Sequence, residues 1–320
     1  MKRVLGSMIV ATMAAPAAAQ IVVDGMLDGD YGPALAVQTV QTQFGDSTGG
    51  FSDGGELDAG YAAIAGDRLY VMLTGNIQDN FNKVSVFIDS QPGGENVLDG
   101  ALQYDFNNVA SNFGGLTFDA GFEADHHLFG RWGGGAFVVD FVNRAASTPG
   151  SVRGDTGVAS AGAGTAVQSG AVLGNGIGTT SILTSAVAFG FNNNNSAGVT
   201  GGTAASDPLA AAAVTTGLEF SVALADLGSP GAGDRIQIHA AYGNGDNNFH
   251  SNQILGGVPA PQDNLGGDGG GAFTGNLSGI DFNDFAGDQF FSIRVPESAT
   301  GAIAAALWSL AALAWRRRGA

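Results

Sequence analysis

The chain has 320 residues, of which 53 are Gly and none is Cys, so disulfide bonds and Cys-based metal sites or nucleophiles are excluded. All 29 acidic residues lie between Asp24 and Glu297, a stretch that contains only seven of the twelve Lys and Arg residues. Nucleic acid is excluded as a partner, because contacts to phosphates require clustered cations. The acidity indicates either a surface that keeps an exported protein soluble or one that binds divalent cations.

Residues 1–19 have the parts of a secretory signal peptide. Two basic residues begin the segment, and a short, mostly apolar run follows them. The run is shorter than the roughly 20 residues that span a membrane, which favours cleavage over a retained anchor. The residues that fit the cleavage rule are Ala17, Ala19 and Gln20. We therefore expect export by the secretion machinery and processing by signal peptidase.

Short runs of β-forming residues, separated by turns rich in Gly, Asn and Asp, fill the body of residues 20–294. No segment of this body has a sustained apolar period of 3.6 residues. The pattern predicts an all-β fold, an antiparallel β-sandwich with Gly-rich loops. The expected strands are residues 34–44, 68–74, 83–88, 136–142, 182–191, 217–224, 235–242 and 289–295.

Two parts of the body depart from this simple pattern. Residues 83–88 alternate in a way that suits a strand with one buried face. Residues 147–208 are dominated by Gly, Ala, Ser and Thr, with a run of four Asn at 192–195. Either long loops or weakly specified β-structure fills that stretch.

Two Gly-x-Ser-x-Gly matches and four histidines are the features that an enzyme could use. Ser47 and Ser52 are the central residues of the matches, but a nucleophile of this kind needs a strand-to-helix turn, and no helix follows. His126 and His127 are neighbours and would point to opposite faces of a strand, so they would not share a metal. We expect surface or loop histidines and no catalytic site.

Clustered acidic and amide side chains suggest structural calcium as a cofactor. Calcium prefers oxygen ligands, which one cluster in residues 24–30 and another in residues 244–248 could supply. The same residues serve equally in turns, where Asp and Asn side chains bind the backbone. The candidate ligands are Asp24, Asp28, Asp30, Asn244, Asp246 and Asn248.

Trp132 is the one Trp between the terminal segments, and it lies in the Gly-rich run of residues 130–135. Carbohydrate binding uses exposed aromatic side chains as platforms. Trp132 on a loop is therefore the candidate residue for binding a polysaccharide.

The C-terminus, residues 295–320, has three parts in a fixed order. Val295, Pro296 and Glu297 come first, and the uncharged apolar residues 299–315 follow. Seventeen helical residues reach about 25 Å, so they predict a marginal transmembrane helix. The closing cluster, which would stay cytoplasmic, is Arg316, Arg317 and Arg318.

This arrangement resembles the PEP-CTERM sorting signal over residues 295–320, with Ser298 where the family usually has a second Pro. The resemblance implies recognition by an exosortase, removal of the tail, and release or attachment at the cell surface, often beside exopolysaccharide. The inner membrane would hold the chain transiently. The alternative is a plain C-terminal membrane anchor.

The body resembles DOMON-like and family-9-type carbohydrate-binding jelly-roll domains in four short segments. These segments are residues 24–32, 69–74, 84–89 and 217–224. The resemblance implies a jelly-roll-like sandwich and nothing specific about a ligand. We therefore expect an exported, non-catalytic protein of the cell surface or extracellular matrix. A carbohydrate-binding module of the envelope or exopolysaccharide is the alternative.

Overall fold

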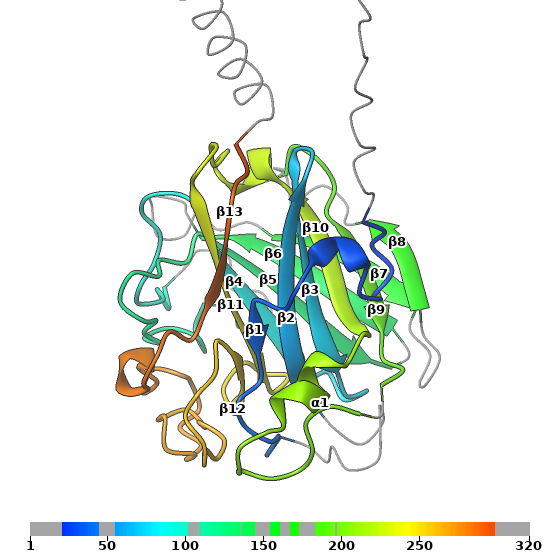
Figure 1. Ribbon diagram of the computed structural model, residues 1–320. Coiled ribbons are helices and arrows are strands. Elements are labelled where there is room, and N and C mark those ends of the chain that lie inside the picture. Colours follow the sequence, from blue (N-terminus) through cyan, green and yellow to red (C-terminus); the bar gives the residue numbers. More distant parts are fainter. Residues whose placement is uncertain are drawn as a thin grey trace, which may run out of the picture.

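The computed structural model describes residues 21–44, 55–101, 108, 110–134, 136–144, 154–160, 167–172, 183–195 and 197–297. Within these residues the regular structure is almost entirely β-strand, arranged as two antiparallel sheets (Figure 1). The described body is therefore all-β, as the sequence predicts. The expected C-terminal helix lies outside the described residues.

The first sheet has six strands. In spatial order they are β1 (Ala36–Val37), β2 (Glu56–Ala65), β3 (Arg68–Asn76), β10 (Gly217–Ala223), β9 (Ala188–Asn192) and β8 (Val167–Val172). At the centre β10 runs antiparallel to β3 from Gly217 opposite Thr74 to Ala223 opposite Arg68. The Gly-rich stretch therefore contributes strands as well as loops.

The second sheet has seven strands. In spatial order they are β12 (His250–Leu255), β11 (Arg235–Gly243), β4 (Lys83–Asp89), β5 (His126–Gly133), β6 (Ala136–Asn143) and β7 (Gly154–Ser160). The seventh strand, β13 (Phe291–Arg294), pairs with the first half of β11, and β12 pairs with its second half. Two short strands thus complete one edge of the sheet.

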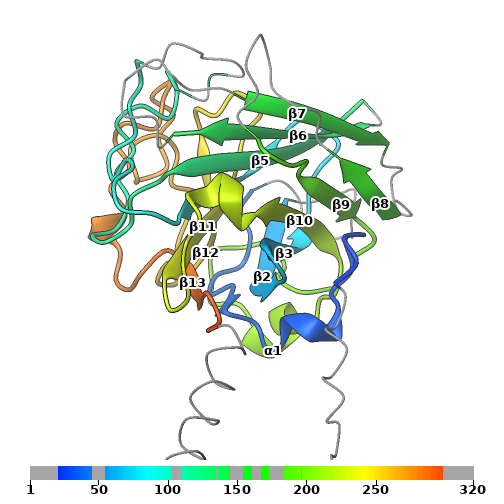
Figure 2. The same ribbon diagram turned by 90° about the horizontal axis from the view of Figure 1, so that it is seen from above.

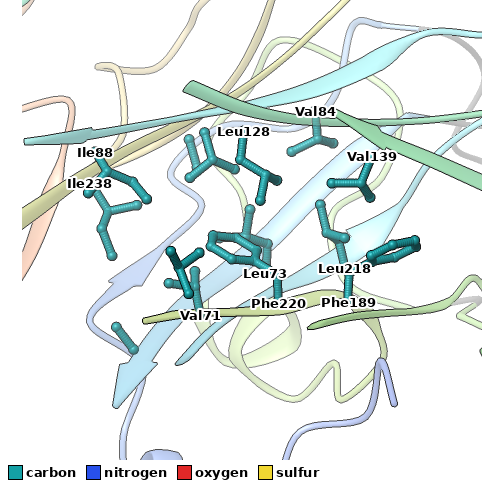
Figure 3. Packing of buried hydrophobic residues seen from close by; sticks show 14 of the residues in the cluster. Val71, Leu73, Val84, Ile88, Leu128, Val139, Phe189, Leu218, Phe220 and Ile238 are labelled. Atoms are coloured by element: carbon teal, nitrogen blue, oxygen red, sulfur yellow. The ribbon is translucent and has the colours of Figure 1, made fainter. Parts of the chain in front are cut away.

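The two sheets pack face to face on a common apolar core (Figure 3). Alternate residues of each strand supply this core, because side chains of a strand point in turn to its two faces. Val84 and Ile88 of β4 face Val71 of β3 and Phe220 of β10 across the interface. Each such side chain, once buried, contributes about 1.5–3 kcal/mol to the stability. The packing defines a β-sandwich.

Long connections cover the outer face of the second sheet and form a further layer. Phe87 of β4 points outward and packs against Phe113 and Phe118, and Phe282 joins the same cluster from another connection. Both faces of β4 are therefore buried, whereas the alternation of residues 83–88 predicts one. The polar-looking face of β4 is covered by loops that lie far away in the sequence.

Each of the eight expected strands overlaps an observed one, and outside the Gly-rich stretch of residues 147–208 three observed strands were not expected. The missed strands are β2, β5 and β12. Polar residues that lie buried disguise all three: β12 reads His-Ser-Asn-Gln-Ile-Leu, and each of its six residues is buried. A strand covered on both faces can hide polar side chains whenever the covering layer supplies hydrogen bonds, and sequence periodicity does not reveal that layer.

The N-terminal segment lies on the outer face of the first sheet. Tyr31, from the 3-10 turn η1 (Gly29–Tyr31), packs edge-on to Tyr61 of β2. The remaining short elements are α1 (Pro208–Ala212) and the 3-10 turns η3 (Leu224–Leu227) and η4 (Phe282–Asp284). Figures 1 and 2 show that the first and last described segments lie on the same side of the body.

Candidate functional site

An exposed aromatic side chain, Phe81, lies in the turn that joins β3 to β4. Gln78 closes this turn, because its Oε1 accepts hydrogen bonds from the side-chain amides of Asn80 and Asn82. The backbone N–H of Asn82 in turn donates to Asn80 Oδ1. Phe81 has a φ of 67° and is 53% exposed. A bulky residue in this left-handed region costs about 1–3 kcal/mol, so the turn holds the ring outward against a local preference.

The Phe81 ring rests on the end of β5. Gly133 lies directly beneath it: a Cβ atom there would come within 2.3–2.6 Å of three ring atoms. The backbone N–H of Phe81 donates to the carbonyl of Trp132 at 2.8 Å, which fixes the turn to this strand. One face of the ring is thus backed by glycine backbone, and about half of the side chain remains open. This geometry makes Phe81 an aromatic platform.

The turn of residues 244–248 lies beside this platform. Gly245 approaches the carbonyl of Phe81 so closely that a Cβ on it would lie 3.0 Å from that oxygen. Beneath, the buried ammonium of Lys83 donates to the Gly245 carbonyl. Burial, followed by the neighbouring Arg131, lowers the pKa of Lys83 to about 8. The two polar turns therefore form one surface around Phe81, with the exposed Asp79, Asn80 and Asp246 at its border.

Two of the three calcium candidates in the second turn use their side chains to close it. Asn244 Oδ1 accepts from the backbone N–H groups of Asn248 and Phe249, and Asn244 Nδ2 donates to Asn248 Oδ1 at 2.6 Å. Asp246 is exposed, and its backbone carbonyl accepts from the Asn112 amide. Asn244 and Asn248 thus make the turn-closing hydrogen bonds that compete with metal binding.

Two of the calcium candidates in the N-terminal segment also accept hydrogen bonds from the backbone. Asp24 Oδ1 accepts from the backbone N–H of Met26, and Asp28 Oδ2 accepts from that of Val22. Asp30 is exposed in η1. Among the described residues no three His, Asp or Glu side chains come together as a metal-binding group. Calcium at either cluster stays a prediction.

Trp132 lies in β5 and is 1% exposed, so it does not offer the exposed platform that the sequence analysis expected. Its ring packs edge-on to Phe191 in the core between the sheets, with 5.8 Å between ring centroids. The expectation failed because the Gly-rich run is the end of a strand that turns Trp132 inward. Its neighbour in space, Phe81, is the exposed ring. The sequence signal that could have found it is an apolar residue inside the polar turn Gln-Asp-Asn-Phe-Asn.

All four histidines are buried, which corrects the expectation of surface or loop histidines. His126 packs on Phe141, and His127 stacks on Phe87 with 3.9 Å between ring centroids, so the two do point to opposite faces. Burial lowers the pKa of His126 to about 4, of His239 to about 3 and of His250 to about 4. It also lowers the pKa of His127 well below its usual range. These imidazoles are neutral at pH 7 and are closed off from solvent.

A second polar feature is a hollow of about 300 Å³ near the ends of β4 and β11. Its lining residues are Asp89, Ser90, Gln91, Pro92, Asp234 and Arg235. No aromatic residue lines it, so it lacks a ring on which a sugar could stack. The Phe81 surface is the better candidate for a ligand.

The junction with the expected sorting tail lies at the end of the described body. Val295 is buried, and its backbone N–H donates to the carbonyl of Asp234. Pro296 and Glu297 are exposed. The expected cleavage residues Ala17, Ala19 and Gln20, the Arg316–Arg318 cluster, and Ser47 and Ser52 lie outside the described residues. Within the described residues no helix is long and apolar enough to cross a bilayer.

Comparisons with protein-family models, with curated proteins and with solved structures find no match to this chain.

Proposed function

We propose that this protein is an exported, non-catalytic component of the cell surface or extracellular matrix, sorted by an exosortase-type system. The ordered tail carries the proposal: Val295, Pro296 and Glu297, then the apolar residues 299–315, then three Arg. Those apolar residues would form the C-terminal helix, and the body would have a jelly-roll-like topology. The structure supports a processed tail, because the chain is pinned to the body at Val295 and emerges at Pro296.

The buried histidines support the non-catalytic part of the proposal. A general acid or base must reach the substrate and have a pKa near the working pH. The histidine rings lie in apolar clusters, and burial holds their pKa values near 3–4 or below the usual range. A substrate outside the body would not reach them.

The test is intact-mass measurement of the protein that the producing cell releases. We expect the released wild-type protein to lack residues 308–320. In a matched variant, Arg316, Arg317 and Arg318 are each replaced by Gln, which removes the charge but keeps the length. We expect this variant to stay in the membrane fraction with its tail intact. Released wild-type protein that still carries residues 308–320 would contradict the proposal.

A carbohydrate-binding role is the second candidate, and the Phe81 platform favours it. The ring is backed on one side by Gly133 and open on the other, and amide and carboxylate groups border it. Such a surface can stack on the apolar face of a sugar ring while Asn80 and Asp246 hydrogen-bond to hydroxyls. The acidic border favours a neutral polysaccharide over an anionic one.

Affinity electrophoresis of the mature protein in gels containing neutral polysaccharides tests this role. We expect Phe81→Ala to weaken retardation about tenfold, since a lost aromatic stack is worth about 1 kcal/mol or slightly more. Phe273→Ala is the matched control, because Phe273 is 65% exposed but lies in a different loop. Equal retardation of wild type and Phe81→Ala, or equal losses in both variants, would rule out the Phe81 site.

A further inference from the structure

A pair of carboxylates is buried at the start of β2, at the edge of the sandwich core. Glu56 is 3% exposed and Asp58 is 0% exposed. The pairing of β2 with β3 shifts between Leu57 and Ala59, so Asp58 is the extra residue of a β-bulge. The bulge places both acids beside the loop that follows β9.

The run of four Asn residues closes over this pair. Asn195 Nδ2 lies 3.1 Å from Glu56 Oε1 and 3.4 Å from Asp58 Oδ2. The backbone N–H of Val199 donates to Asp58 Oδ1 at 2.8 Å. Gly198 permits this approach, because its φ is 109° and a Cβ on it would lie 2.0 Å from Asp58 Oδ1. The low-complexity Asn run therefore has a specific place in the fold.

Neither carboxylate has a cationic partner among the described residues. The two ion pairs found there are Arg131–Asp140 and Arg144–Glu95. Burial raises the pKa of both carboxyl groups, and the charge of Asp58 adds to the rise for Glu56. Two buried acids without a counter-charge are costly to ionise.

The cluster also brings several oxygen atoms within reach of one amide nitrogen. Asn195 Nδ2 carries two hydrogens but has three oxygen neighbours, those of Glu56, Asp58 and the Ala197 carbonyl, within 3.4 Å. Independently, Asn76 is 2% exposed, and its Oδ1 has no hydrogen-bond partner among the described residues. The Nδ2 of the same Asn76 side chain lies 3.2 Å from Glu56 Oε1 and 3.3 Å from the Asn195 carbonyl oxygen. Rotating the side-chain amide of Asn76 by 180° exchanges Nδ2 and Oδ1, which places Oδ1 beside Glu56 Oε1 and the Asn195 carbonyl oxygen.

We propose that Glu56, Asp58 and Asn76, together with the backbone carbonyls of Asn195 and Ala197, form a calcium site. Calcium takes six to eight oxygen ligands from carboxylates, amides and carbonyls in flexible geometry, which this set supplies if one carboxylate binds through both oxygens. In the ion-free state the amide nitrogen of Asn76 lies among the ligand oxygens, and binding turns its side-chain oxygen inward. The ion also supplies the missing positive charge. This site differs from both clusters that the sequence suggested and does not depend on the proposed function.

Thermal unfolding of the full mature chain, in excess calcium and in excess chelator, tests the site. We expect calcium to raise the melting temperature of the wild type by about 5 °C at a hundredfold excess over the dissociation constant. Asp58→Asn is nearly isosteric and removes one buried charge, so it should fold in chelator and lose the calcium response. Asp24→Asn and Asp246→Asn are matched controls in the other two acidic clusters and should keep it.

Isothermal titration with calcium chloride gives a second measurement that does not depend on unfolding. We expect one ion per chain for the wild type and for both controls, and at least a tenfold weaker binding for Asp58→Asn and for Glu56→Gln. No heat of binding and no shift in melting temperature for the wild type would overturn the proposal. A response that Asp58→Asn keeps but Asp24→Asn or Asp246→Asn loses would overturn it equally.

Discussion

At the scale of single residues, the structure buries Trp132, which the sequence suggests as an exposed platform, and exposes Phe81 instead. Their backbones are joined by a hydrogen bond, yet Trp132 is 1% exposed and Phe81 is 53% exposed. The pairing of β5 with β6 decides which way Trp132 points, since it sets Trp132 opposite Phe137 at the end of the ladder. Of these two rings, the one in the polar turn is therefore the exposed one, although Trp is the rarest aromatic residue in the chain.

The two aromatic residues should differ sharply in their effect on stability. We expect Trp132→Ala to lower the free energy of unfolding by about 3–5 kcal/mol, because it leaves a cavity between the sheets. We expect Phe81→Ala to change it by about 1 kcal/mol or less, because the ring is half exposed and its backbone is strained. Urea unfolding of both variants measures the difference. Similar losses in both would mean that Phe81 is part of the core.

His127 makes the stability of the fold depend on pH, because its imidazole is buried in the neutral form. Within the part of the chain that the structure describes, its ring nitrogens have no hydrogen-bond partner, and burial holds its pKa far below the ordinary value of 6.5. As the pH falls below 6.5, the unfolded chain takes up a proton at this residue that the folded chain does not, so folding becomes less favourable.

The free energy of unfolding of the wild type should fall between pH 7 and pH 5. We expect this fall to be about 2 kcal/mol smaller in His127→Leu. The comparison uses the change with pH within each protein, so the altered packing of Leu cancels. Urea unfolding of wild type and variant at both pH values gives the result. Parallel pH curves for the two proteins would show that His127 is not buried in its neutral form.

At the scale of elements, Glu219 holds the N-terminal segment on the first sheet. It is fully buried in β10, and its Oε1 accepts from the Tyr31 hydroxyl at 2.7 Å. Its Oε2 accepts from the backbone N–H groups of Asp24 and Gly25. One side chain thus satisfies three donors from a segment that has few other backbone partners. The acidic segment that begins at Asp24 is thus held in place by a carboxylate 195 residues away in the sequence.

We expect Glu219→Ala to release the N-terminal segment from the sheet, because it leaves three donors without an acceptor and each such loss costs about 1–3 kcal/mol. Limited proteolysis should then cut within residues 21–32 much faster than in the wild type. Glu219→Gln is the control, since its amide oxygen can still accept, and we expect a smaller increase. Cleavage rates equal to the wild type in Glu219→Ala would show that Tyr31 packing and the backbone hydrogen bonds of Gly25 and Leu27 hold the segment without Glu219.

At the scale of the whole molecule, buried acids set the stability above neutral pH. Burial raises the pKa of Glu219 to about 7, and it also raises the pKa of the neighbouring carboxyl groups of Glu56 and Asp58. The folded chain keeps protons that the unfolded chain has already released at these pH values. The stability that they contribute is complete below about pH 4 and is lost as the pH rises through the folded pKa values.

We therefore expect the melting temperature in chelator to fall steadily between pH 7 and pH 9. The histidines do not offset this fall, because they are neutral in both states above about pH 7.5. The combined change of Glu56→Gln and Asp58→Asn should flatten the curve, since both groups then stop titrating. A wild-type melting temperature that is constant over this range would mean that the two acids are ionised in the folded chain.

The sequence alone determined the all-β class and the position of most central strands, but it left open whether the Gly-rich stretch forms loops or strands. Local composition decides these properties, because alternation and β-formers act within a few residues. It also suggests the two terminal sorting motifs, which stay a prediction. Only the tertiary structure decided that β12 and the histidines are buried, that Trp132 faces inward and Phe81 outward, and that Glu56 and Asp58 meet the Asn run. These features depend on residues about 50 to 200 positions apart, which approach only when the sheets and their covering loops pack together.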